Sequence, residues 1–233
     1  AAIVEIVNDT EYHVRLIQAN KKGVFVDMGF KYDGTNVSPA SLEALVLGDI
    51  HVGDSDLSVM NANLEMIKQY NPKRIVLHDF FNGHSVNHHN VNQSVTRAQY
   101  AKAGRSYLEE ELDLCASELR KFAEGANDSQ IIIPACNHHD FLLKYLQSGE
   151  FVNDPYNVRV ASQILPDVID GKDAVETGLK LFGYMPSNVK FLSRDEDYKL
   201  MGWQIGAHGD KGNNGARGNI TSTETAYGKS ITG

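Results

Sequence analysis

Short apolar or alternating runs dominate the first part of the chain, at residues 2–7, 13–17 and 24–26. Asn, Asp and Gly residues separate these runs, and such residues are typical of tight turns between β-strands. Residues 1–43 are therefore predicted to form a β-rich N-terminal segment.

From residue 44 onward, apolar runs with the character of buried strands alternate with runs that have the period of a helix. Strands are predicted at residues 44–47, 74–77, 130–134, 189–192 and 203–205. Asp56 is expected to cap a helix that Pro72 ends, and further helices are predicted at about residues 94–124, 140–146, 161–170 and 174–182. This alternation is typical of an α/β sandwich or a doubly wound sheet, formed by residues 44–233.

The bulk composition sets only broad limits on function. A chain of 233 residues with a net charge of −8 has no overall basic field for nucleic acid, although a local basic groove or bound metal ions would still meet a phosphate. The two cysteines, Cys115 and Cys136, give no disulfide framework and are expected to be reduced, buried thiols. No apolar run approaches the ~20 residues that span a bilayer. A cytoplasmic protein without membrane association is therefore expected, and the start without Met suggests a fragment of a longer chain.

Polar residues follow the predicted strands at the points where those strands end. Asp49 and His51 come directly after the strand at 44–47, and their spacing allows both side chains to point the same way. Asp79, the pair Asn137-His138, and His208 follow later strands. Binding sites in α/β sheets gather at the carboxyl ends of strands, and mixed oxygen and nitrogen ligands suit Mn²⁺, Fe²⁺ or Zn²⁺. The sequence therefore predicts a metal site at this edge of the sheet.

Two metal ions ~3.5–4 Å apart can hold a phosphate oxygen, activate a water and stabilise an in-line displacement. Asp79 is placed to bridge such a pair, and His138 would donate a proton to the departing oxygen. Each motif alone also has an ordinary explanation. Asp-x-His occurs by chance, Asp79 would serve as a cap, Asn137-His138 would form a turn, and the His-rich loop after Asp79 is more simply a solvated loop. Their order along the chain makes the metal-site interpretation stronger than any one of them.

The ordered set resembles the calcineurin-like metallophosphoesterases, the superfamily that includes the purple acid phosphatases. Their pattern runs D-x-H, G-D-x-x-D/N, G-N-H-D/E, a lone His, and G-H-x-H. Asp49 and His51 match the first block. Residues 79–82 match the second block, with His78 in place of Gly, and residues 137–138 match the third, with Cys136 in place of Gly. His208 matches the lone His.

This resemblance implies an α/β fold, a metallophosphoesterase-type β-sandwich flanked by helices in four αββα layers. It also implies that Asp49 and His51 bind one metal, Asp79 bridges, Asn137 and His208 bind the second, and His138 is the acid. Two divalent ions are implied as cofactors, with Mn²⁺ expected ahead of Fe²⁺, Zn²⁺ or Mg²⁺.

The G-H-x-H block of this pattern is not present. Residues 207–210 would be a degenerate version in which Asp210 replaces the last His. The favoured interpretation is that residues 229–233 lead into this block and that the chain is truncated at its Gly. Each metal would then lack one ligand, the chain would bind metal weakly or be inactive, and the closing strands of the second sheet would be missing.

Glycine recurs at every third position from Gly206 to Gly218. This stretch is either a flexible loop or a loop whose amides, with Lys211 and Arg217, approach a phosphate beside His208. Asn82 and His84 are expected as further substrate contacts. The glycine-rich stretch and the Asn/His-rich loop after Asp79 resemble phage-encoded members of the superfamily, including a pre-early type implicated in host DNA degradation.

The sequence thus predicts a two-metal phosphodiesterase, most simply a Mn²⁺-dependent DNA nuclease that acts in the host cytoplasm if it is phage-encoded. The alternatives are a phosphomonoesterase or nucleotide phosphatase, and an inert interaction module that keeps the fold. Residues 1–43 would cover a sheet edge, extend the core or mediate assembly, so a homo-oligomer remains open.

Overall fold

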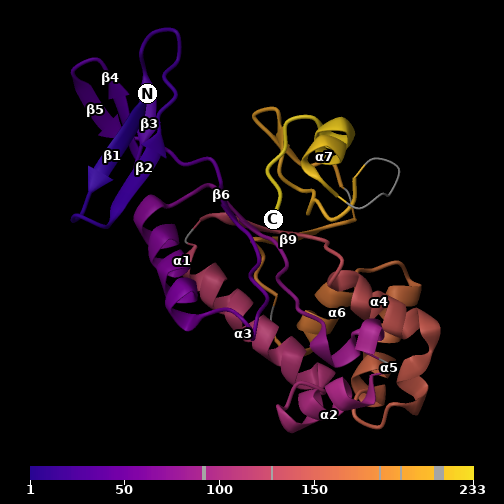
Figure 1. Cartoon of the computed structure of the whole chain (residues 1–233). Coiled ribbons are helices and arrows are strands. Elements are labelled where there is room, and N and C mark those ends of the chain that lie inside the picture. Colours follow the sequence, from indigo (N-terminus) through magenta and orange to yellow (C-terminus); the bar gives the residue numbers. More distant parts are fainter. Residues whose placement is uncertain (91–92, 127, 184, 195, 213–217) are drawn as a thin grey trace. The chain divides into compact units, whose positions relative to one another are not determined.

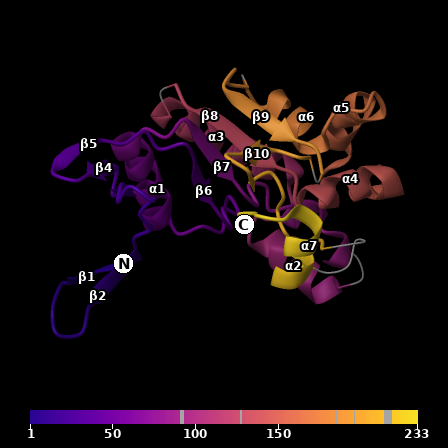
Figure 2. The same ribbon diagram turned by 90° about the horizontal axis from the view of Figure 1, so that it is seen from above.

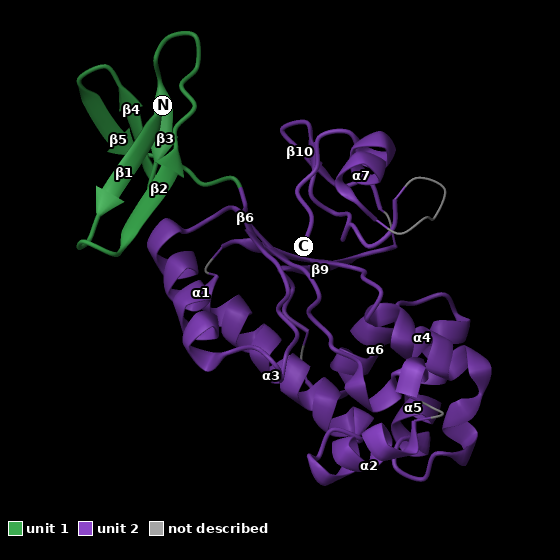
Figure 3. Cartoon of the chain, viewed as in Figure 1, with its two compact units in different colours: residues 1–43 green, residues 44–233 purple. Residues whose placement is uncertain are grey.

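A computed structural model of the chain describes residues 1–90, 93–126, 128–183, 185–194, 196–212 and 218–233. Contacts between Cα atoms divide it into two compact units, residues 1–43 and residues 44–233 (Figure 3). The first unit is small and entirely β-structured where it has regular structure, and the second carries all the helices that the structure describes.

The N-terminal unit consists of two antiparallel sheets, as its alternating pattern predicts. β1 (Ala2–Ile6) and β2 (Tyr12–Leu16) form a hairpin. β3 (Phe25–Asp27), β4 (Phe30–Asp33) and β5 (Asn36–Pro39) form a three-stranded sheet. Arg15 links the two sheets, because its guanidinium donates hydrogen bonds to Glu5 at 2.7 Å and to Asp27 at 3.1 Å. The regular structure of residues 1–43 therefore consists of β-strands.

The second unit is built on one parallel sheet in which spatial order follows chain order. The strands are β6 (Leu45–Leu47), β7 (Arg74–Leu77), β8 (Gln130–Pro134) and β9 (Val189–Leu192). Successive side chains of a strand point to opposite faces. Ile75 and Leu77 therefore join the larger core cluster on one face, whereas Val76 joins a smaller cluster on the other.

Helices cover the face of the sheet that carries the larger core cluster (Figures 1 and 2). They are α1 (Leu57–Tyr70), α3 (Leu108–Gly125), α4 (His139–Ser148) and α6 (Ala174–Leu181), and α5 (Val158–Ile169) packs against α6. The cap predicted for the first of them is present, since the carboxylate of Asp56 accepts a hydrogen bond from the amide of Ser58 at 2.7 Å. Asn71, in the left-handed conformation, ends the same helix just before Pro72.

The opposite face of the sheet is covered by the last part of the chain. Val76 and Ile132 pack there with Leu192 and Ile205. The covering elements are a hairpin of β10 (Lys199–Leu200) and β11 (Trp203–Gln204), an extended segment that pairs Ser230 with Gln204, and α7 (Ile220–Tyr227). The α/β class is thus confirmed. The described residues give a two-stranded hairpin at the place of a second sheet, so the four-layer β-sandwich stays a prediction.

Two helix predictions need correction. The single helix expected over residues 94–124 is instead α2 (Ser94–Lys102) followed by α3. Gly104 adopts the left-handed region with φ 73°, and the amide of Leu108 bonds to the side chain of Asn157 at 2.8 Å, so the helix stops and restarts. Helix α7 was not predicted, although Asn219 and Ser222 form a capping box at its start.

Two composition-based expectations can be compared with the structure. Cys115 and Cys136 are free thiols and both are buried, as predicted. Among the helices of the described residues, none has the length and apolar character needed to cross a membrane.

Candidate metal centre

The chain segments that leave β6 and β7 continue side by side beyond the strands. The amide of Ile50 bonds to the carbonyl of His78 at 3.2 Å, and the amide of His51 bonds to the carbonyl of Asp79 at 2.8 Å. This ladder extends the parallel pairing past Leu47 and Leu77. It brings His51 and Asp79 to the same point at the carboxyl edge of the sheet.

Three residues at this edge adopt left-handed backbone conformations that only glycine adopts freely. Their φ angles are 49° for Asp49, 38° for His51 and 49° for Asp79. Such conformations cost about 1–3 kcal/mol each in non-glycine residues and cluster at functional sites. Asp and His tolerate them better than branched residues do. The local strain therefore marks the place where the sequence predicts metal ligands.

His51, Asp79 and His138 form a group with the geometry of a metal site. Each offers one ligand atom, and these atoms lie within 4.8 Å of one another. Asp79 is only 3% exposed, and its Oδ1 is buried with no hydrogen-bond partner among the described residues, like Nδ1 of His51. Unpaired buried polar atoms are costly, and a divalent cation would satisfy them. The residues present therefore fit a metal ion.

His208 approaches Asp79 from the segment that follows β11. Its Nε2 lies 3.4 Å from Oδ2 of Asp79, and its Nδ1 is buried without a partner in the described part of the chain. The carboxylate of Asp79 thus meets imidazoles from the segments after β6, β8 and β11.

His78 is a further imidazole at this edge, at the position where the metallophosphoesterase pattern has Gly. Its side chain is fully buried, both ring nitrogens lack partners among the described residues, and its ring centroid lies 5.9 Å from that of His208. Burial, with a smaller contribution from His208, lowers the pKa of His78 to about 4. His78 is therefore a neutral imidazole near pH 7.

Two of the predicted ligands do not join the close group. The side chain of Asp49 is 80% exposed, and its Oδ1 lies 3.7 Å from Nε2 of His51 at the rim of the site. Asn137 is half-buried beside His138, and the described residues give its amide no hydrogen-bond partner. The ligand roles of Asp49 and Asn137 stay predictions.

The orientation of His138 is fixed by the main chain of the loop after β7. Its Nδ1 lies 2.6 Å from the carbonyl oxygen of Asn82. A carbonyl only accepts, so Nδ1 carries the hydrogen and Nε2 is left for the site. The ring also packs edge-on against His51, with centroids 4.7 Å apart.

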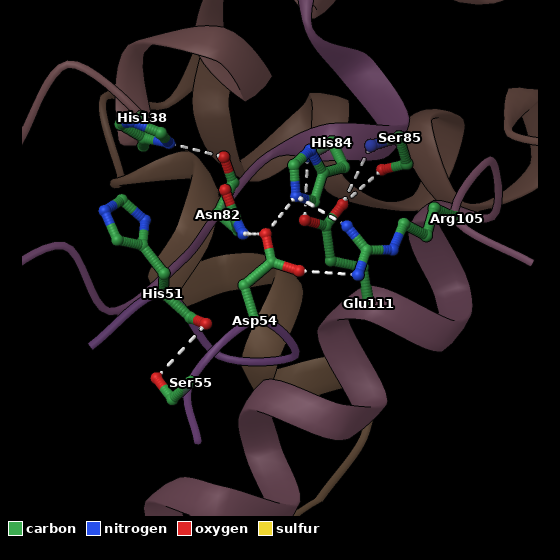
Figure 4. A network of polar contacts seen from close by, with 9 residues as sticks. All are labelled: His51, Asp54, Ser55, Asn82, His84, Ser85, Arg105, Glu111 and His138. Atoms are coloured by element: carbon green, nitrogen blue, oxygen red, sulfur yellow. Dashed lines mark hydrogen bonds and ion pairs between the residues drawn. The ribbon is translucent and has the colours of Figure 1, made fainter. Parts of the chain in front are cut away.

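Asp54 is the centre of a polar network beside these histidines (Figure 4). Its Oδ2 accepts hydrogen bonds from the amide of Asn82 at 2.8 Å and from Nε2 of His84 at 2.6 Å, and Arg105 contacts Oδ1 at 2.6 Å. Burial alone would raise the pKa of Asp54, but the hydrogen bonds from His84 and Asn82 outweigh it, so this pKa lies below its usual value. The carboxylate is therefore ionised and holds three groups together.

Glu111 holds the same loop from the side of α3. Its carboxylate accepts hydrogen bonds from the amides of His84 at 2.9 Å and Ser85 at 3.1 Å, and from the Ser85 hydroxyl at 2.6 Å (Figure 4). These bonds anchor the start of η1 (His84–Val86). The polar side chains of Asn82 and His84, predicted to contact substrate, are thus directed at Asp54. Asp54, Arg105 and Glu111 were not predicted, because no local pattern distinguishes them from surface charges.

A cavity of about 240 Å³ opens beside the candidate metal centre. It is lined by Asp49, His51, Asp54, Ser55 and Asn82. The cavity gives a small ligand access to the group around Asp79 from the side of the segment after β6.

The glycine-rich stretch is explained in part by close packing. A Cβ at Gly218 would overlap the carbonyl oxygen of Gly209, and the amide of Gly218 bonds to the carbonyl of Asp210 at 2.8 Å. Lys211 is half-buried, and Arg217 lies outside the described residues. The predicted phosphate contacts of these two residues stay predictions.

The sheet and its edge define a mixed α/β protein with a candidate metal centre of His and Asp side chains. No family model matches the chain, and no solved structure matches it. The chain is 27% identical over 242 residues to Protein A1 of Escherichia phage T5, an alignment that covers 94% of this chain and 42% of that protein. The chain therefore spans less than half the length of this curated relative, and the similarity is compatible with a phage origin.

Proposed function

We propose that the chain is a metal-dependent phosphodiesterase that acts on nucleic acid. The observation that carries the proposal is the position of Asp79, a buried carboxylate with an unpaired oxygen among His51, His138 and His208. The order of the motifs, their resemblance to metallophosphoesterases, and the phage relative all support this proposal.

In this proposal, His51, Asp79 and His208 would hold two divalent ions, and Mn²⁺ is the ion expected. When bound, such ions polarise a phosphoryl oxygen and lower the pKa of water, which is the chemistry that phosphate ester hydrolysis needs. Asp49 and Asn137 would complete the ligand set at the rim.

His138 moves the proton in the proposed reaction. Because its Nδ1 donates to the carbonyl of Asn82, its Nε2 is left for the site. The imidazolium form of His138 would give its Nε2 proton to the departing oxygen and become the neutral tautomer with the hydrogen on Nδ1. Asn82 keeps its position because Asp54 holds its side chain. The network around Asp54 therefore positions the acid without contact with the reacting atoms.

The proposal is tested by hydrolysis of a small diester, bis(p-nitrophenyl) phosphate, and of the monoester p-nitrophenyl phosphate in the presence of Mn²⁺. We expect Mn²⁺-dependent cleavage with preference for the diester, and also cleavage of an unlabelled oligonucleotide. Asp79→Asn should abolish both activities, whereas Asp113→Asn, an exposed change on α3, should leave them unchanged.

Two results would overturn parts of the proposal. Preference for the monoester would exclude the nuclease and leave a phosphatase. Failure of the unaltered chain to bind Mn²⁺ in titration calorimetry, even with the ion in large excess, would exclude the metal centre in this chain.

A further inference from the structure

We propose that a second cavity, connected to the candidate metal centre by the loop after β7, binds a base of single-stranded nucleic acid. It lies between residues 85–90, helix α2 and residues 150–157. This inference rests on the proposed function, because it names the substrate class of the same site, and it is tested below by an experiment that does not depend on turnover.

The segment that forms one side of this cavity differs in charge from the rest of the chain. The whole chain has 30 acidic and 22 basic residues, yet residues 80–108 contain no Asp or Glu. The same segment contains cationic side chains and histidines, which are Arg97, Lys102, Arg105, His84, His88 and His89. The segment itself therefore adds no negative charge. Asp54 pairs with its His84 and Arg105, whereas Arg97 and Lys102 have no ion pair among the described residues. Such a stretch lowers the repulsion of a polyanion.

The cavity has the size and the lining of a base-binding pocket. Its volume of about 350 Å³ lies at the lower end of the range for small-ligand sites. Tyr100 and Tyr156 offer aromatic faces, and Asn87 and Asn90 offer amides. Proteins bind the bases of single strands by stacking on aromatic rings, with hydrogen bonds to the base edges.

The charged residues that line the cavity are Asp154, Glu150 and the cation Arg97. The carboxylate of Asp154 accepts hydrogen bonds from the hydroxyl of Tyr145 at 2.9 Å, the amide of Asn157 at 3.0 Å and the main chain of Tyr156 at 3.0 Å. Arg97 lines the same cavity, and its guanidinium has no partner in the described part of the chain. Glu150 is exposed at the rim. Arg97 is therefore the side chain that would meet a phosphate.

One loop connects this cavity to the candidate metal centre. Asn82 lines the cavity beside His51, and Ser85 and Val86, three and four residues later, line the second cavity. The ring of His84 packs edge-on against Tyr100, with centroids 5.2 Å apart. A single strand that follows this loop away from Asp79 would bring one of its bases to Tyr100. A base inside a duplex is stacked and paired, so the pocket fits a single strand.

The test measures the affinity of a labelled single-stranded oligonucleotide that carries 2-aminopurine, in EDTA, so that no metal is bound and nothing is cleaved. We expect Tyr100→Ala to weaken binding roughly tenfold or more and to remove the fluorescence quenching of the stacked base. Tyr100→Phe keeps the aromatic face and should keep both. Arg97→Ala should reduce the slope of log affinity against log salt concentration by about one, because one phosphate contact is lost. Lys180→Ala, an exposed cation on α6, should change neither.

Wild-type affinity and quenching in both Tyr100→Ala and Arg97→Ala would overturn the inference. If Tyr100→Ala does not fold, as judged by thermal unfolding, Arg97→Ala tests the inference alone. An unchanged salt slope in Arg97→Ala would then overturn it. Failure of the proposed function gives a different result, in which the unaltered chain binds the oligonucleotide with Tyr100-dependent quenching but hydrolyses no diester in Mn²⁺.

Discussion

The Nδ1 atom of His138 and the carbonyl oxygen of Asn82 lie 2.6 Å apart, and this contact joins two loops that leave neighbouring strands. It fixes the tautomer of the histidine and therefore selects the ring nitrogen that faces Asp79. Asn82 is itself held by Asp54, and the loop that follows it is held by Glu111. The orientation of the candidate acid therefore depends on carboxylates that lie outside the metal-binding group.

The first prediction concerns the dependence of His138 on Asp54. Asp54→Asn should lower the rate of diester hydrolysis about 10–100-fold, because the partners that orient a site residue have effects of this size. Mn²⁺ stoichiometry should not change, since Asp54 is not in the ligand group. The measurement is kcat together with calorimetric titration of Mn²⁺. Asp167→Asn, an exposed change on α5, is the matched control. An unchanged kcat in Asp54→Asn would contradict a positioning role.

The second prediction concerns acid stability. The pKa of Asp54 is lower in the folded protein than its usual value, because the hydrogen bonds from His84 and Asn82 outweigh the effect of burial. A lowered carboxyl pKa stabilises the fold above the unfolded pKa of about 3.9 and loses this contribution as pH falls through the folded value. The chain should therefore be more stable than Asp54→Asn at pH 7, and the difference should vanish on acidification. Urea unfolding of both proteins from pH 7 down to acidic pH measures this difference in stability. A difference that grows towards low pH would refute the lowered pKa of Asp54.

The third prediction separates metal ligands from the proton donor. Asp79→Ala should abolish Mn²⁺ binding at both positions, because its carboxylate lies between His51 and His208. His138→Ala should keep two ions and lose turnover. Mn²⁺ titration followed by electron paramagnetic resonance measures the stoichiometry, with the exposed His13→Ala as the control. Loss of one ion in His138→Ala would make His138 a ligand, and two ions in Asp79→Ala would refute the bridging role.

Local patterns predicted those parts of the fold that local physics determines. The strand at 189–192 and the cap at Asp56 were predicted because each depends on only a few neighbouring residues. The break between α2 and α3 was missed, because helical periodicity continues across Gly104 while the bond from Leu108 to Asn157 is a long-range contact. It was also not predictable that the last part of the chain covers one sheet face with a hairpin.

The distinction between local patterns and long-range contacts also applies to the candidate site. Asp79 and His208 were predicted because each follows an apolar strand, and the structure brings them to 3.4 Å. The role of Asp54 was not predictable, since it depends on Asn82, His84 and Arg105 converging from two other segments. An acidic residue with three distant partners has the same local sequence as an acidic residue on the surface.

The last prediction tests the packing that supports the sheet from the helical side. A Cβ at Gly178 on α6 would lie 2.9 Å from both terminal methyl groups of Leu112 and 3.3 Å from Ile164. Leu112 is fully buried on α3. Gly178→Ala should therefore lower the free energy of unfolding by about 1–3 kcal/mol, the usual cost of overpacking a core.

Gly125→Ala is the matched control for this change. A Cβ at Gly125, in the last turn of α3, would meet Leu64 at 3.7 Å, which is an ordinary contact. The gain in helix propensity should raise the free energy of unfolding by up to about 1 kcal/mol. The free energies of unfolding of the two variants, measured with urea, should thus change in opposite directions. A Gly178→Ala variant as stable as the unaltered chain would show that α3 and α6 do not pack as closely as Leu112 and Gly178 indicate.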